Sequence, residues 1–118
     1  MGNAAETKYD ILQGTLDLMV LKTLDAMGPM HGYGIARRIE QISEAALHVN
    51  QGTIYLCLIR LVQKGWIDAS WGTSENNRKA KFYAISKAGK RQLAAEARNW
   101  ERVSGVIDRL LTLSPRRP

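Results

Sequence analysis

The stretch that decides the fold is Asn50 to Ser86, NQGTIYLCLIRLVQKGWIDASWGTSENNRKAKFYAIS. Asn50 is a good helix cap, because its side chain can accept a hydrogen bond from the amide of Thr53. Apolar residues at helical spacing then predict a buried face, made by Ile54, Leu58, Leu61 and Val62. Gly65 is typical of the residue that ends a helix. The stretch is therefore predicted to open with a short amphipathic helix.

A basic β-hairpin is predicted directly after this helix. The strands are expected at 66–71 and 78–85, with the turn at 72–77 between them. The helix itself is expected to carry a second, largely polar face, made by Thr53, Cys57, Arg60 and Lys64. A helix with a polar face, followed by a hairpin with Arg and Lys, is the layout of a winged helix that binds DNA. The predicted fold class is mainly α with a small β-hairpin.

Length and composition limit the class of protein. The 118 residues fit one domain, and 45% hydrophobic residues is ordinary for a globular chain. The lone Cys57 cannot form an internal disulfide, which favours a reducing compartment. The apolar run 16–24 is too short to span a membrane, and Met1 to Glu6 lack the features of a signal peptide. These features predict a cytoplasmic protein.

The net charge of +6 is concentrated in one segment. Residues 51–91 contain eight basic and two acidic residues, which accounts for the whole excess. A basic segment of this kind is the footprint expected of a protein that binds the phosphate backbone of DNA. The alternative is a solvated basic face without a polyanionic partner.

Two further helices are predicted before the central stretch. The first runs from 10 to 27, after an N-terminal tail at 1–9, and ends at Gly28-Pro29. The second runs from 31 to 43 and forms a helix-turn-helix unit with the helix that starts at Gln51. In the linker between them, Leu47-His48-Val49 is expected to pair as a short strand. The winged helix-turn-helix domain is therefore placed at 10–86.

A C-terminal dimerisation helix is predicted at 87–112, capped by Ser86 and followed by a basic tail at 113–118. Its apolar residues form a heptad seam that the rest of so small a domain cannot cover, so a second copy is the expected partner. The alternative is packing on helix 10–27 of the same chain, and both contacts can coexist. The predicted interface residues are Leu16, Val20, Leu93, Trp100, Val103, Ile107 and Leu110.

The residues offer little for catalysis. The two histidines, His31 and His48, lack metal-ligand spacing, and the chain has no glycine-rich phosphate loop or nucleophile elbow. We therefore expect no enzyme activity, no metal and no cofactor. The candidates for binding double-stranded DNA, by base edges and by phosphates, are Tyr33, Asn50, Gln51, Thr53, Tyr55, Leu56, Arg60, Lys64, Arg78, Lys79 and Lys81.

Two side chains have alternative interpretations. Trp100 is either a large anchor of the dimer seam or, facing its copy across a two-fold axis, a stacking platform for a flat hydrophobic effector. Cys57 is either a small filler of the core or the thiol of a redox-sensing regulator. A third alternative concerns the whole chain, as a winged helix that recognises a protein and binds DNA weakly or not at all.

Several segments, taken in order, resemble the PadR family of bacterial transcriptional regulators. The segments are LQGTLD at 12–17, GPMHGYGI at 28–35, GTIY at 52–55, GWI at 65–67, RKAKFY at 78–83 and SKAG at 86–89. With its short length and single C-terminal helix, the chain is similar to the smaller branch of the family. It departs from the family pattern at Gln51 and Leu56, where proline is usual.

The resemblance implies a homodimeric repressor that binds a near-palindromic operator. Some members of the smaller branch bind flat hydrophobic drugs at the dimer interface. The segment Asn99-Trp100-Glu101-Arg102-Val103 is similar to the one that carries their stacking tryptophan. The resemblance therefore implies a role for Trp100 in binding a small hydrophobic effector.

Overall fold

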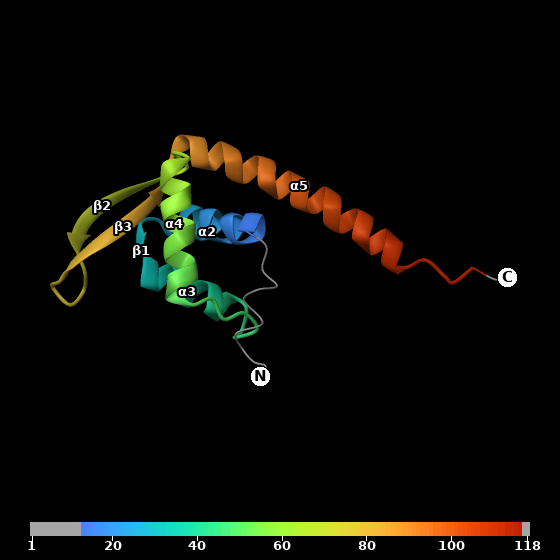
Figure 1. Cartoon of the computed structure of the whole chain (residues 1–118), viewed down its shortest axis with the longest axis horizontal. Helices are drawn as coiled ribbons and strands as arrows, with labels where there is room; N and C mark the ends of the chain where they lie inside the picture. The colour runs from blue at the N-terminus through green and yellow to red at the C-terminus, as the bar shows by residue number, and fades with distance from the viewer. Residues whose placement is uncertain (1–12, 117–118) are drawn as a thin grey trace.

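Four helices and three short strands follow one another along residues 13–116, the part of the chain that the computed structural model describes (Figure 1). In chain order the elements are α2 (Gln13–Met27), β1 (Met30–His31), α3 (Gly32–Ile42), α4 (Gln51–Gln63), β2 (Ile67–Thr73), β3 (Lys79–Ile85) and α5 (Lys87–Leu111). The winged helix-turn-helix prediction is confirmed. The first residues of the helix expected at 10–27 lie outside the described part.

Local signals set both ends of α4 as predicted. The Asn50 side chain accepts a hydrogen bond of 2.7 Å from the Thr53 amide. At the other end Gly65 has φ +76°, a backbone conformation that side chains with a Cβ rarely adopt. The amides of Gly65 and Trp66 then donate to the carbonyls of Val62 and Leu61, which pairs the last carbonyls of the helix. The helix therefore begins and ends where the sequence places it.

The sheet has three antiparallel strands in the order β1-β3-β2. In the hairpin of β2 and β3, called the wing below, β2 ends two residues later than predicted and β3 begins one residue later, with the turn at Ser74–Arg78. The prediction of a strand at Leu47-His48-Val49 is wrong, because β1 at Met30–His31 occupies the outer edge of β3. Gly28, with φ +83°, reverses the chain after α2 and brings β1 to that edge.

The core lies between α2, α3, α4 and the base of the wing. Ile54, Leu58 and Leu61 are buried as predicted, whereas Val62 is exposed. The predicted polar face is also wrong in part, because Cys57 is only 1% exposed and packs in the core. The helix is therefore rotated relative to the prediction, and its exposed face is the one that contains Leu56 and Ile59.

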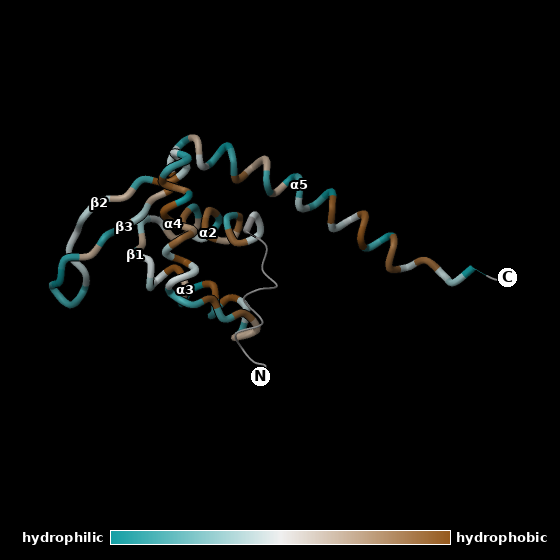
Figure 2. Tube along the Cα trace, viewed as in Figure 1, coloured by the Kyte–Doolittle hydropathy of each residue, from teal (hydrophilic) through white to brown (hydrophobic). Residues whose placement is uncertain are grey.

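Helix α5 starts against the wing and then leaves the body of the molecule. The Ser86 hydroxyl accepts a hydrogen bond from the Gly89 amide and donates one to the Gly65 carbonyl. A Cβ at Gly89 would lie 1.9 Å from the Trp66 carbonyl oxygen, so only glycine fits here. Beyond this turn α5 projects from the body and carries recurring apolar residues (Figures 1 and 2). No helix in the described part is long and apolar enough to cross a membrane.

Candidate nucleic-acid interface

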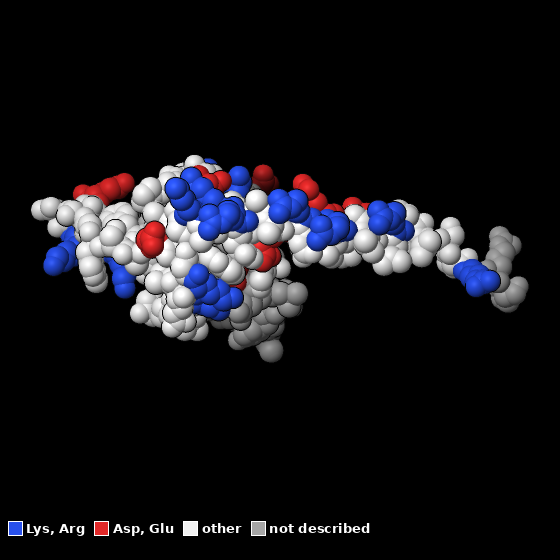
Figure 3. Space-filling view, turned by 90° about the horizontal axis from the view of Figure 1, so that it is seen from above, with Lys and Arg blue, Asp and Glu red and all other residues white. Residues whose placement is uncertain are grey.

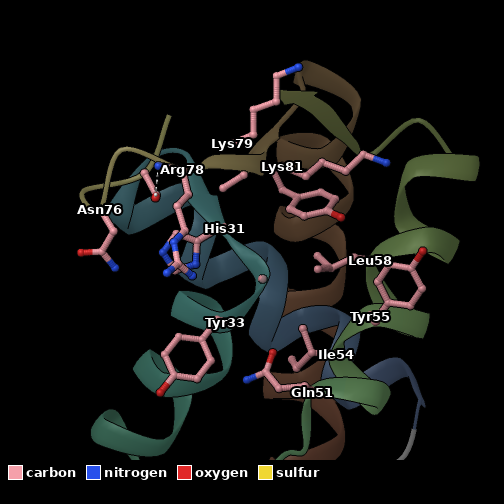
Figure 4. Close-up of a pocket in the computed structure, with 14 residues that line it drawn as sticks. His31, Tyr33, Gln51, Ile54, Tyr55, Leu58, Asn76, Arg78, Lys79 and Lys81 are labelled. Atoms are coloured by element: carbon pink, nitrogen blue, oxygen red, sulfur yellow. Dashed lines mark hydrogen bonds between the residues drawn. The ribbon is translucent and has the colours of Figure 1, made fainter. Parts of the chain in front are cut away.

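A groove of about 420 Å³ separates the start of α4 from the wing (Figure 4). Its apolar floor is formed by Ile54, Leu58 and the buried Tyr83, and burial raises the pKa of the Tyr83 hydroxyl. The polar side chains around it come from α3, α4 and the wing. The groove contains six of the predicted DNA-binding residues, namely Tyr33, Gln51, Tyr55, Arg78, Lys79 and Lys81.

The alternation of side chains along β3 determines on which face of the wing its lysines lie. Lys79 lies opposite Thr73, and Lys81 lies opposite Trp71, so both lysines occupy the same face of the hairpin as the buried Tyr83. Arg78 stands at the end of the turn, where its amide donates to Ser74 Oγ at 3.3 Å. None of these three cations forms a salt bridge with another residue of 13–116. Their charge therefore remains available to an anionic partner.

The start of α3 supplies an aromatic edge to the same groove. His31 caps this helix, with Nδ1 accepting a hydrogen bond of 3.0 Å from the Gly34 amide. Tyr33 follows and is exposed, and its hydroxyl accepts a hydrogen bond of 3.1 Å from Arg37. That hydrogen bond also raises the pKa of Arg37. Arg37 was not predicted from the sequence as a residue of this site, although its i+4 spacing from Tyr33 indicates that the two side chains can meet on one face of the helix.

The other predicted DNA-binding residues lie outside the groove. Asn50 uses its side chain as the helix cap, and Thr53 is half-buried beside it. Leu56 is exposed on the outer side of α4. The Lys64 ammonium lies at the far end of the helix, 4.7 Å from the centre of the Trp66 ring. These positions leave Leu56 and Lys64 accessible to a large ligand.

Arg60 has a different environment from the one predicted. Its guanidinium forms an ion pair with Asp17 of α2, and the same carboxylate accepts a hydrogen bond of 3.2 Å from Cys57 Sγ. Asp17 is buried, and Arg60 is largely enclosed. We therefore assign Arg60 a structural role in holding α4 against α2.

The chain, with its basic groove on a helix-turn-helix scaffold, is similar in sequence to known proteins. A model of the "Transcriptional regulator PadR-like family" matches residues 20–95. The chain belongs to this family. An uncharacterised protein of Lysinibacillus sphaericus is 29% identical over 101 residues, covering 86% of this chain and 92% of that protein.

Solved structures of transcriptional regulators share the fold. A PadR-like transcriptional regulator from Bacillus cereus is 25% identical, with a TM-score of 0.76, over 89% of this chain and 99% of its own. A transcriptional regulator from Clostridium thermocellum is also 25% identical, with a TM-score of 0.76, over 85% and 96% of the two chains. The PadR-like protein described here is therefore a transcriptional regulator with a winged helix-turn-helix fold.

The thiol of this PadR-like regulator is poorly suited to redox sensing. Burial, reinforced by the hydrogen bond to Asp17, raises the pKa of Cys57 to about 12. At neutral pH the side chain is therefore a thiol, whereas the thiolate is the reactive form. The same shift makes the folded state lose stability as pH rises from about 9 toward 12, because the unfolded chain releases this proton first.

We expect Cys57 to be unreactive toward a disulfide reagent in the native protein at pH 8. Because the side chain is inaccessible and protonated, labelling should proceed only after addition of denaturant. The measurement is the absorbance of the released thiolate of Ellman's reagent with and without 6 M guanidinium. Rapid labelling of one thiol per chain in native buffer would support the redox-sensing alternative instead.

The predicted dimer residues fall into two groups. Leu16, Val20 and Leu93 are buried within the single chain, so they belong to its own core. This placement revises their predicted role. The residues further along α5 are exposed, namely Trp100, Val103, Ile107 and Leu110. The α5 seam, defined from here on as these four residues, is therefore an uncovered apolar surface.

Trp100 also borders an apolar cavity of about 510 Å³ between α2, the end of α3 and α5. Its walls include Leu18 and Met19 from α2 together with Leu93 and Ala97 from α5. The Trp100 side chain is 52% exposed, so one part of it lines the cavity while another faces solvent. Both interpretations of Trp100, as dimer anchor and as effector platform, are compatible with this position.

Proposed function

We propose that this regulator binds double-stranded DNA through the groove between α4 and the wing. The observation that carries the proposal is a set of three cations, Arg78, Lys79 and Lys81, which line this groove together with residues of α4 and form no salt bridge within 13–116. Lys and Arg side chains lie at the wing end of the molecule and along α5 (Figure 3). Cations that neutralise phosphates supply most of the affinity of such an interface.

The groove and the exposed residues of α4 around it have distinct tasks in this proposal. The wing cations contact the phosphate backbone or enter the minor groove. The exposed hydroxyls of Tyr33 and Tyr55 donate to phosphates, and Lys64 adds a charge contact. The first turns of α4, which include Gln51, Thr53 and Leu56, enter the major groove and meet base edges.

We further propose that two copies associate through the α5 seam and act as a repressor. An amphipathic helix that leaves its own domain with an exposed seam needs a partner to cover it. A two-fold dimer would place two recognition helices on half-sites about 34 Å apart, one DNA turn, and would favour a near-palindromic operator. A small hydrophobic effector in the cavity beside Trp100 would release the DNA if it preferred another spacing of the recognition helices.

The direct test is fluorescence anisotropy of labelled DNA from upstream of the gene, compared with a scrambled duplex, across a series of salt concentrations. We expect tight binding to the upstream fragment alone, with a steep fall in affinity as salt rises. Equal and weak binding to both duplexes would argue against specific DNA recognition. A winged helix that recognises a protein would behave in that way, although it has no need of unpaired cations on its wing.

A further inference from the structure

The exposed face of α4, the helix proposed to read DNA, is largely apolar. Tyr55, Leu56, Ile59 and Val62 are exposed on it, and Leu56 is the most exposed of the four at 64%. On a helix these positions fall within one arc of about 120°, since each residue advances by about 100°. The only other residues of this arc are a glycine and a glutamine, Gly52 and Gln63.

Charged groups are absent from this arc. Arg60, the only charged side chain between Gln51 and Gln63, turns inward to the buried carboxylate of Asp17. Lys64 follows the last turn and lies over the ring of Trp66. Helix α4 therefore has no free cation with which to meet a base edge at the centre of its exposed face.

Base edges in the major groove differ in what they require of a protein. Guanine is read mainly by Arg or Lys on its O6 and N7, adenine by Asn or Gln on its N6 and N7, and thymine by apolar contact with its C5-methyl group. The arc of α4 matches the last of these, and Gln51, beside the arc in the first turn of the helix, matches adenine. The basic residues that α4 lacks are on the wing, where the proposed function has them contact phosphates.

The apolar arc and the basic groove are continuous. Gln51 and Tyr55 line the groove opposite the wing cations, while Leu56 and Ile59 lie next to them on the outer side of the helix. A polyanion as wide as a DNA duplex, held by the wing, would therefore also reach the arc. This charge next to the arc favours DNA over a protein as the partner that covers its apolar residues.

We propose that α4 reads thymine methyl groups through Leu56 and Ile59, and that the operator positions beneath this helix are A·T pairs, with Gln51 on an adenine. The proposal rests on DNA binding by the groove. It makes Leu56 and Ile59 the residues that set sequence specificity, whereas the wing sets affinity. Each methyl group buried against them contributes about a fourfold gain in affinity.

The test starts with selection of duplexes from a random library by the full-length protein. Thymines in the selected site are then replaced one at a time by uracil, which removes only the methyl group. We expect about fourfold weaker binding for each contacted thymine, and we expect Leu56→Ala and Ile59→Ala to bind more weakly while abolishing the difference between thymine and uracil. Leu113→Ala, which removes a side chain of similar exposure beyond the end of α5, should keep that difference.

Two results would overturn the inference in distinguishable ways. In the first, the protein binds a selected site tightly, replacing thymine with uracil does not change the affinity, and replacing guanine with 7-deazaguanine lowers it. This result would show readout of guanine and leave the proposed DNA binding intact. No enrichment from the library, together with no binding of the wild-type protein to the upstream fragment, would remove both proposals together.

Discussion

Replacing Asp17 with alanine is expected to lower the free energy of unfolding by about 3 kcal/mol. The Asp17 carboxylate is buried, pairs with Arg60 and accepts the Cys57 hydrogen bond, so it joins α2 to α4 at two points. Its removal leaves the guanidinium of Arg60 partly buried without a counter-charge, which costs more than the pair itself contributes. Urea denaturation followed by circular dichroism measures the change.

Two controls separate this mechanism from a general effect of losing a carboxylate. Asp25→Ala breaks a surface pair with Lys22, in which the two charged atoms are 3.9 Å apart, and should change stability by less than about 1 kcal/mol. The double variant Asp17→Ala with Arg60→Met removes the stranded charge and should be more stable than Asp17→Ala alone. A loss for Asp17→Ala no larger than that for Asp25→Ala would contradict the structural role of the ion pair.

Replacing Ile107 with aspartate is expected to weaken the proposed dimer by about 1000-fold. Each dimer would lose two buried isoleucines, worth roughly 2 kcal/mol apiece, and would bury two unpaired carboxylates in their place. The monomer should fold normally, because Ile107 is exposed in the single chain and does not contribute to its core. Sedimentation velocity gives the oligomeric state, and circular dichroism reports the fold.

The same variant should also bind operator DNA much more weakly, since the two half-sites are no longer engaged by one particle. Ala95→Asp is the matched control, because Ala95 is exposed on another side of α5 and receives the same charge. This control should sediment as the wild type does. An Ile107→Asp protein that stays dimeric would show that the α5 seam is not the interface.

The parts of the fold that the sequence predicts correctly depend on neighbours a few residues away. Asn50, Gly65 and Ser86 each fix a helix end through hydrogen bonds or backbone conformations within that segment. The wing follows in the same way, because strand alternation places Lys79 and Lys81 together on one face. Each of these signals can be read locally from the sequence.

The rotation of α4 could not be predicted in this way. Cys57 and Arg60 face inward because a carboxylate on α2, about 40 residues earlier in the chain, satisfies both of them. Seen without that partner, Arg60 is assigned to solvent and Val62 to the core. The edge strand β1 was missed for a similar reason, since two residues have no pattern of their own and pair only because β3 lies beside them.

Several residues of the groove could be predicted from the sequence, but the orientation of α4 beside it could not. Tyr33 and the wing cations lie around one groove, although some 45 residues separate them in the chain. By contrast, the sequence alone does not show that Cys57 and Arg60 turn inward and leave Val62 on the exposed face of α4.

The most direct test of the central claim measures how DNA affinity depends on salt concentration in two double variants, each of which lacks two cations. Arg78→Ala with Lys81→Ala removes two cations from the groove, and Arg98→Ala with Arg102→Ala removes two exposed cations from α5 that lie outside the basic segment 51–91. If the groove binds the phosphate backbone, the first pair lowers the slope of log affinity against log salt by about 1.8 per subunit, and the second leaves it unchanged. An equal change in both pairs, or an unchanged slope in the first, would contradict DNA binding by this groove.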